Sequence, residues 1–197
     1  MCSFGAGEGE DGPGTVQGDL MVDYYAGYNC AHPGVKIWGE LSGSSSNFSP
    51  GAHGLHVHAS NGIADGCGGL GGHFQGGVDS IHGAPDFMLG ERHAGDLGNI
   101  WIGDDNTATV YIEDHYLNLQ EGSNLNIANV GMVLHALPDD FNPERSPTST
   151  GAAGSRVGCC VFTPPPPPPE EPSFDGVSSL NIFFDIGPCT RVIFIYI

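Results

Sequence analysis

Basic residues are scarce in this sequence of 197 residues. Five lysines and arginines stand against 23 aspartates and glutamates, so the formal net charge is −18. Because so acidic a surface repels phosphates, we expect neither nucleic acid nor an anionic membrane as a partner. No apolar run reaches the roughly 18 residues of a membrane-spanning helix. No basic segment followed by an apolar run opens the chain, so we expect no secretory signal and a cytoplasmic location, while an extracellular one stays open.

Glycine and proline are plentiful, with 32 and 15 residues, and the apolar runs between them are short. Apolar and polar residues alternate at residues 16–25, 35–41 and 108–113, which is typical of half-buried strands, and we expect a last strand at residues 156–162. Several short strands at this spacing predict an all-β fold, an antiparallel Greek-key sandwich or barrel. Residues 1–12 interleave glycines with acidic side chains and have little β-propensity, so a first strand there should be short or absent.

Two long segments, residues 59–97 and 136–155, lack any clear period. Loops of that length are uncommon in a compact domain unless something holds them, so we expect them to be functional. The character of the chain changes after residue 163, where six consecutive prolines begin a polyproline linker. The predicted organisation is therefore a domain at 1–163, a linker at 164–172 and a tail of unknown role at 173–197. A disordered appendage and a docked strand or partner peptide are both open for the tail.

Histidines are concentrated in one stretch, since five of the nine fall between His56 and Asp96. In a strand, His56 and His58 would point to the same side, with Cβ atoms roughly 6 to 7 Å apart. His93 and Asp96 are three residues apart, a spacing at which a turn can bring a nitrogen and an oxygen ligand together. Imidazole suits copper and zinc, and an added aspartate fits a closed zinc site. The spacing therefore predicts a site for two metal ions.

The residues around these histidines resemble copper/zinc superoxide dismutases. The motifs that carry the resemblance are Gly54-Leu55-His56-Val57-His58, Gly72-His73-Phe74, Gly90-Glu91-Arg92-His93-Ala94-Gly95-Asp96-Leu97-Gly98-Asn99 and Gly154-Ser155-Arg156-Val157-Gly158-Cys159. They occur in the family's order, and the likeness runs from about Gly12 to Phe162. It implies an immunoglobulin-like Greek-key β-barrel or sandwich of about eight strands with two long functional loops.

The resemblance also implies a ligand set. The copper ligands would be His56, His58, His73 and His135, and the zinc ligands would be His73, His82, His93 and Asp96. His73 would serve both ions and take part in catalysis. Another histidine, His53, resembles a structural residue of the family rather than a ligand.

Further residues take roles from the same resemblance. Arg156 falls where the family places the guanidinium that docks substrate, and Asp139 where it places a carboxylate that hydrogen-bonds ligands of both metals, although Asp140 could take that role. Cys67 and Cys159 match the family's disulfide. No family partner exists for Cys2, Cys30, Cys160 and Cys189. We expect Cys160 to be a buried thiol beside the disulfide, with mispairing to Cys67 as the alternative.

The function that the resemblance implies is conversion of superoxide to oxygen and hydrogen peroxide by copper redox cycling, with zinc in a structural role. A non-catalytic metal-binding or interaction module on the same fold is the first alternative. A copper chaperone with a dismutase-like domain is the second, but the sequence has no Cys-x-x-Cys or Cys-x-Cys pair to hand over copper. Implied partners are superoxide as substrate, a second copy of the chain in a homodimer with an altered interface, and a copper chaperone.

Overall fold

The structure is a computed structural model that describes residues 1–5, 8–9, 12–13, 16–25, 34–142, 151–163, 180–184 and 191–195. Its strands are β1 (Cys2–Phe4), β2 (Glu8–Gly9), β3 (Gly12–Pro13), β4 (Val16–Tyr25), β5 (Gly34–Gly43), β6 (Gly51–His58), β7 (Asp96–Ile102), β8 (Thr107–Asp114), β9 (Gly131–His135), β10 (Arg156–Val161), β11 (Leu180–Phe184) and β12 (Arg191–Ile195). Two 3₁₀ helices, η1 (Ile63–Asp65) and η2 (Cys67–Leu70), follow β6. The predicted linker at 164–172, Cys30 and Cys189 lie outside the described residues.

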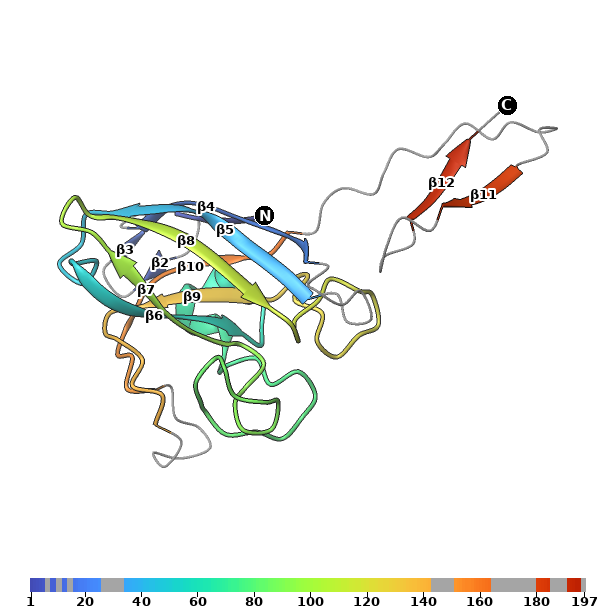
Figure 1. The fold of residues 1–197 in the computed structure, drawn as a ribbon. Helices are drawn as coiled ribbons and strands as arrows, with labels where there is room; N and C mark the ends of the chain where they lie inside the picture. The colour runs from blue at the N-terminus through green and yellow to red at the C-terminus, as the bar shows by residue number, and fades with distance from the viewer. Residues whose placement is uncertain are drawn as a thin grey trace.

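Eight of the strands form two antiparallel sheets that lie one above the other (Figure 1). The first has the order β1-β4-β5-β8 and the second the order β10-β9-β6-β7. The chain leaves the first sheet after β5, builds β6 and β7 into the second, and returns as β8 beside β5. This crossing places β6 and β9 side by side, and both carry histidines of the predicted metal site.

The architecture is a sandwich. The sequence was compatible with either a sandwich or a barrel, and within the described residues the two sheets do not close into a barrel. Residues 103–106 turn the chain from β7 into β8, which pairs with β5 instead of β7. At the opposite edge, two hydrogen bonds between Met1 and Thr163 connect the ends of β1 and β10. The predicted all-β fold is confirmed in this two-sheet form.

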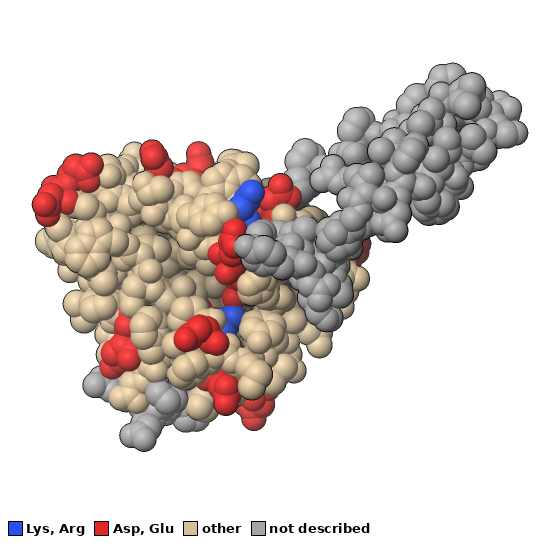
Figure 2. Space-filling view, in the orientation of Figure 1, with Lys and Arg blue, Asp and Glu red and all other residues tan. Residues whose placement is uncertain are grey.

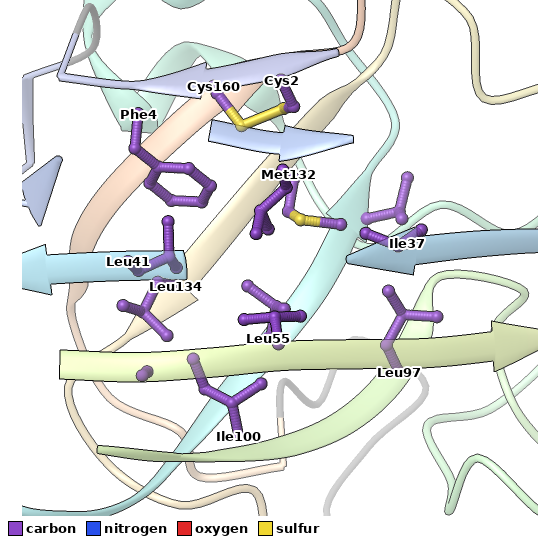
Figure 3. Close-up of a cluster of buried hydrophobic side chains, with 14 of the residues drawn as sticks. Cys2, Phe4, Ile37, Leu41, Leu55, Leu97, Ile100, Met132, Leu134 and Cys160 are labelled. Atoms are coloured by element: carbon purple, nitrogen blue, oxygen red, sulfur yellow. A yellow bond between two sulfur atoms is a disulfide. The ribbon is translucent and has the colours of Figure 1, made fainter. Parts of the chain in front are cut away.

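One buried core fills the space between the sheets (Figure 3). Because successive side chains of a strand point to opposite faces, β8 buries Ala108 and Val110 while Thr109 and Tyr111 face outward. Both sheets contribute to the core, among others through Ile37, Leu41, Leu55, Leu97, Ile100, Met132 and Leu134. Burial of this apolar surface is the main force that holds the two layers together.

The first strand forms but is short, since β1 has three residues. It pairs antiparallel with β4, with Cys2 opposite Leu20 and Phe4 opposite Gly18. Cys2 is fully buried and joined to Cys160 by a disulfide. The expectation of a free thiol at Cys160 was therefore wrong, because pairing with β4 brings Cys2 within 5.4 Å of Cys160, Cα to Cα, a separation that depends on the tertiary fold.

Acidic side chains are scattered over the face shown in Figure 2, with little basic surface between them. In the tail, β11 and β12 form an antiparallel pair with Leu180 opposite Ile195. No helix among the described residues is long and apolar enough to span a membrane.

Candidate metal centre

The second sheet and the loop after β6 bring four histidines together. β6 supplies His56 and His58, β9 ends at His135, and His73 lies in the loop, where it forms an isolated bridge with His58. All four are buried, and one ring nitrogen from each lies within 4.8 Å of the others. This is the predicted copper group.

Each ring of this group uses one nitrogen in a hydrogen bond and leaves the other without a partner among the described residues. Because a carbonyl or carboxylate oxygen can only accept, the bonded nitrogens of His56, His58 and His135 carry the proton and the orientation of these rings is set. Nδ1 of His73 instead faces the second group, which contains Asp96. The acceptors are Asp139 for His56, Gly71 for His58, Asp96 for His73 and Gly154 for His135, at 2.8, 2.8, 2.6 and 3.2 Å. The remaining nitrogens are His56 Nδ1, His58 Nε2, His73 Nε2 and His135 Nε2. Buried polar atoms are rarely left unpaired, so these four indicate a bound cation.

The second group surrounds the carboxylate of Asp96, the first residue of β7. Its oxygens lie 2.6, 3.2 and 3.1 Å from the Nδ1 atoms of His73, His82 and His93. Backbone amides of Gly83 and His93 also donate to it, each at 3.0 Å. Three imidazole nitrogens and one carboxylate are a donor set that zinc binds tetrahedrally. His73 contributes Nδ1 to this group and Nε2 to the first.

Asp139 connects the two groups. Its carboxylate accepts hydrogen bonds from Nε2 of His56 and Nε2 of His82, both at 2.8 Å. The side chain is buried, whereas that of Asp140 is exposed, so the carboxylate between the groups belongs to Asp139. Asp139 therefore sets the orientation of the His56 ring in the first group and of the His82 ring in the second.

The electrostatics of the first group favour neutral rings. Burial is the main cause that lowers the pKa of His58 to about 2, of His73 to about 4 and of His135 to about 3, and neighbouring rings lower them further. Burial also lowers the pKa of His82, but hydrogen bonds to Asp139 and Asp96 outweigh it and raise the value to about 9. Neutral rings keep the nitrogen lone pairs that a metal requires.

Burial alone would raise the pKa of both carboxyl groups. Hydrogen bonds from His73, His82 and His93 instead hold the pKa of Asp96 well below its usual range. Those from His56 and His82 do the same for Asp139. Both groups are therefore carboxylates near neutral pH, and the centre offers negative charge to a cation.

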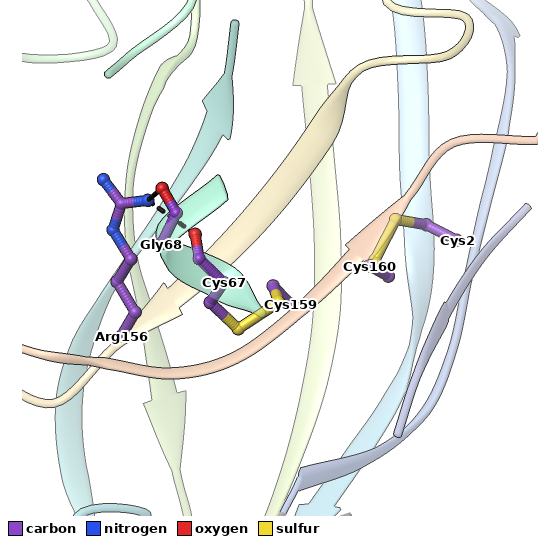
Figure 4. The surroundings of a disulfide bond; sticks show 6 residues. All are labelled: Cys2, Cys67, Gly68, Arg156, Cys159 and Cys160. Carbon is purple, nitrogen blue, oxygen red and sulfur yellow. Dashed lines mark hydrogen bonds between the residues drawn. A yellow bond between two sulfur atoms is a disulfide. The ribbon is translucent and has the colours of Figure 1, made fainter. Parts of the chain in front are cut away.

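Arg156 opens β10 opposite His135 and is half-buried. Its guanidinium donates to the backbone oxygens of Cys67 and Gly71, both at 2.6 Å. Cys67 is joined to Cys159 by a disulfide, which holds η2 against the same strand (Figure 4). The arginine is thus placed beside the first histidine group by the loop that the disulfide anchors.

Two residues that support the metal centre were not identified from the sequence. Arg92 is 1% exposed, and its Nη1 donates to the backbone oxygens of His93, Ala94 and Asp96 while Nη2 reaches Asp114 Oδ2 at 2.6 Å. It ties the turn that carries two ligands to β8 of the other sheet. An arginine inside the motif gives no sign of this burial.

Gly151 is the second residue that supports the metal centre and was not identified from the sequence. A Cβ built there would collide with Asp139 Oδ1 and with His82 Nε2, and its φ is +64°. The residue therefore has to be glycine for the contact between Asp139 and His82 to form. Only the three-dimensional path of the second loop reveals this.

His53 lies outside both groups, as expected for a structural residue. Its Nδ1 contacts the backbone oxygen of His135 at 2.8 Å, and its Nε2 contacts that of Ser49 at 2.8 Å. The ring therefore connects β6 to the end of β9, which carries a member of the first group.

Comparisons with known proteins show what the whole chain is similar to. The family described as copper/zinc superoxide dismutase (SODC) matches residues 28–162. Superoxide dismutase [Cu-Zn] 3 of Arabidopsis thaliana is 40% identical over 124 residues, which make up 62% of this chain and 73% of that protein. Among solved structures, the chain is similar to the clock protein EA4, with a TM-score of 0.64 and 26% identity over 81% of this chain and 90% of that one.

Proposed function

Since the chain belongs to the copper/zinc superoxide dismutase family, its function is the conversion of superoxide to oxygen and hydrogen peroxide with copper and zinc, and we propose that the two buried groups hold these ions. Copper is assigned to His56, His58, His73 and His135, and zinc to His73, His82, His93 and Asp96. We also assign the sandwich to the immunoglobulin-like Greek-key type, because β6 and β7 interrupt the first sheet.

The observation that supports the copper assignment most directly is the set of four unpartnered ring nitrogens. Within the described residues they are the buried nitrogens of the first group that no protein atom satisfies, and they lie within 4.8 Å of one another. Four imidazole nitrogens suit copper, while the carboxylate of the second group suits zinc.

The residues of this chain divide the work of the reaction. Bound copper supplies one-electron redox chemistry, whereas zinc has no redox role. Arg156 binds the superoxide anion through its guanidinium, which is held beside His135. His73 holds or releases a proton at Nε2, while its Nδ1 stays on the side of the second group, 2.6 Å from Asp96. Asp139 keeps the rings of His56 and His82 in place.

Metal analysis together with a superoxide-consumption assay tests this function. We expect about one copper and one zinc per chain, and a lower melting temperature after chelation, because metal binding also stabilises the fold. The variant His135→Ala should lose copper and activity while it keeps zinc. His115→Ala, at an exposed histidine, is the matched control. A protein that binds both metals but does not consume superoxide would support the non-catalytic alternative.

The proposal also covers the oligomeric state of the protein, the loading of copper and the cellular location. The family usually dimerises near its first and last strands, and β1 has only three residues here, so we propose a homodimer with an altered, weaker interface. Light scattering with and without residues 164–197 tests it, and a tight dimer unaffected by the truncation would disprove it. We further propose that a copper chaperone loads the protein, in the cytoplasm unless the chain is exported.

A further inference from the structure

Cys2 and Cys160 form a disulfide that the family resemblance does not account for. We propose that this bond is a reversible redox latch, which holds β1 on the sandwich and opens before Cys67–Cys159 without disturbing the metal centre. The proposal goes beyond the dismutase function, and its main readout does not depend on activity.

The two disulfides leave β10 on opposite faces, because Cys159 and Cys160 are consecutive residues of a strand. Cys159 packs with Cys67, Leu70 and Val133 in a small cluster outside the main core. Cys160 points between the sheets, where it meets Cys2 (Figure 4). Each bond therefore fastens a different element to β10, η2 in one case and β1 in the other.

Apart from the disulfide, the described residues attach β1 through a short strand pairing, hydrogen bonds at Met1 and the burial of Phe4 in the main core. Three residue pairs connect β1 to β4, and two backbone hydrogen bonds join Met1 to Thr163. Phe4 packs near Gly158 of β10, where a Cβ would lie 3.2 Å from the Phe4 ring. Detaching such a terminal strand is a local opening of low free energy compared with unfolding of the domain. That opening exposes Cys2 and Cys160, which are otherwise fully buried.

Cys67–Cys159 is protected by the metal centre itself. To expose it, η2 must move, and the last residue of η2, Leu70, is fully buried. Arg156 holds Cys67 and Gly71 through hydrogen bonds, and His58 holds Gly71 as well. Opening this bond therefore requires the loss of contacts made by a predicted copper ligand. Because exposing Cys67–Cys159 disrupts these contacts and exposing Cys2–Cys160 does not, we infer that Cys2–Cys160 is reduced first.

The chemistry needs only a thiol reductant and a disulfide oxidant. A dithiol opens the latch by two exchanges, in which it donates two electrons and two protons, Cys2 and Cys160 become thiols, and the dithiol becomes a cyclic disulfide. A low-molecular-weight disulfide closes it again through a mixed disulfide and leaves as two thiols. Once released, β1 exposes the edge of β4 at residues 18–20, which is open to pairing with another strand.

The test is a titration of the full, metal-loaded chain with dithiothreitol, followed by alkylation and peptide mapping. We expect Cys2 and Cys160 to be alkylated at reductant concentrations that leave Cys67–Cys159 intact, with superoxide consumption within twofold of the untreated protein. Simultaneous opening, prior opening of Cys67–Cys159, or a loss of activity in step with the opening of Cys2–Cys160 would overturn the proposal.

A double variant, Cys2→Ala with Cys160→Ala, tests the role of the bond in holding β1. Hydrogen exchange at residues 2–4 should be at least tenfold faster, while exchange in β6 and β9 stays unchanged. Ser3→Ala is the matched control, because Ser3 is exposed on the same strand and leaves the disulfide in place. Unchanged exchange at residues 2–4 in the double variant contradicts a latch. If the double variant does not fold, the titration of the unmodified chain decides the question.

Discussion

Arg156 Nη1 donates a 2.6 Å hydrogen bond to the backbone oxygen of Cys67, whose sulfur is bonded to Cys159 on the strand that Arg156 itself begins. The hydrogen bond from Arg156 and the disulfide from Cys159 thus connect β10 to η2 at two points, three residues apart along β10. The position of the guanidinium depends on this double attachment.

The variant Arg156→Ala should lower the rate of superoxide consumption about tenfold or more, on the order of 1.4 kcal/mol, because the anion loses its docking contact. Arg156→Lys should fall less, since it keeps the charge but loses the fork that binds two backbone oxygens. Stopped-flow measurement at fixed metal content checks both. An unchanged rate in Arg156→Ala would remove this residue from the mechanism.

The rate should change little with ionic strength, or rise. The net charge of −18 repels an anionic substrate at long range, and the 136–155 segment has Arg145 as its basic residue against Asp139, Asp140 and Glu144. Arg156 acts within a Debye length of about 8 to 10 Å, so added salt screens the repulsive field more than the local contact. Rate constants measured from low to moderate salt test this. A steep fall would reveal an attractive field around the site.

The variant Gly151→Ala should weaken zinc binding about 10- to 100-fold, as expected for the loss of a group that orients a ligand. The new Cβ would collide with Asp139 and His82, so their hydrogen bond must break. Gly122→Ala is the matched control, because Gly122 has a similar φ of +78° with nothing within 4 Å of an added Cβ. Competition with a chromophoric chelator measures the affinity. Equal losses in both variants would show that backbone strain is responsible, not the collision.

Metal-free protein should lose stability as the pH falls from about 6.5 towards 4. The pKa values of His58, His73 and His135 are lowered in the folded state to about 2, 4 and 3, so below 6.5 the unfolded chain binds more protons than the folded one. His82 acts oppositely, because its pKa is raised to about 9 and its contribution is lost as the pH rises through that value. Urea unfolding after chelation, from pH 4.5 to 9, should give a maximum near neutrality. Stability that is constant or increasing from pH 6.5 to 4.5 would contradict this.

The sequence by itself determined the family and the all-β class, and it predicted the residues that the structure brings together in two groups. These follow from local patterns, since alternation places His56 and His58 on one side of a strand and the motif around His93 and Asp96 is continuous. A short first strand was also among the expectations, because the glycines and acidic residues at 5–12 do not favour a longer one.

Only the tertiary structure decided the rest. Which nitrogen of each histidine is left for a metal depends on acceptors far away in the chain, such as Asp139 for His56 and Gly154 for His135. The pairing of Cys2 with Cys160 across 158 residues, and the bond from the buried Arg92 to Asp114 at the end of β8, arise from contacts between elements that are distant in the chain. No local pattern encodes such contacts, because they form when the two sheets pack and bring distant residues together.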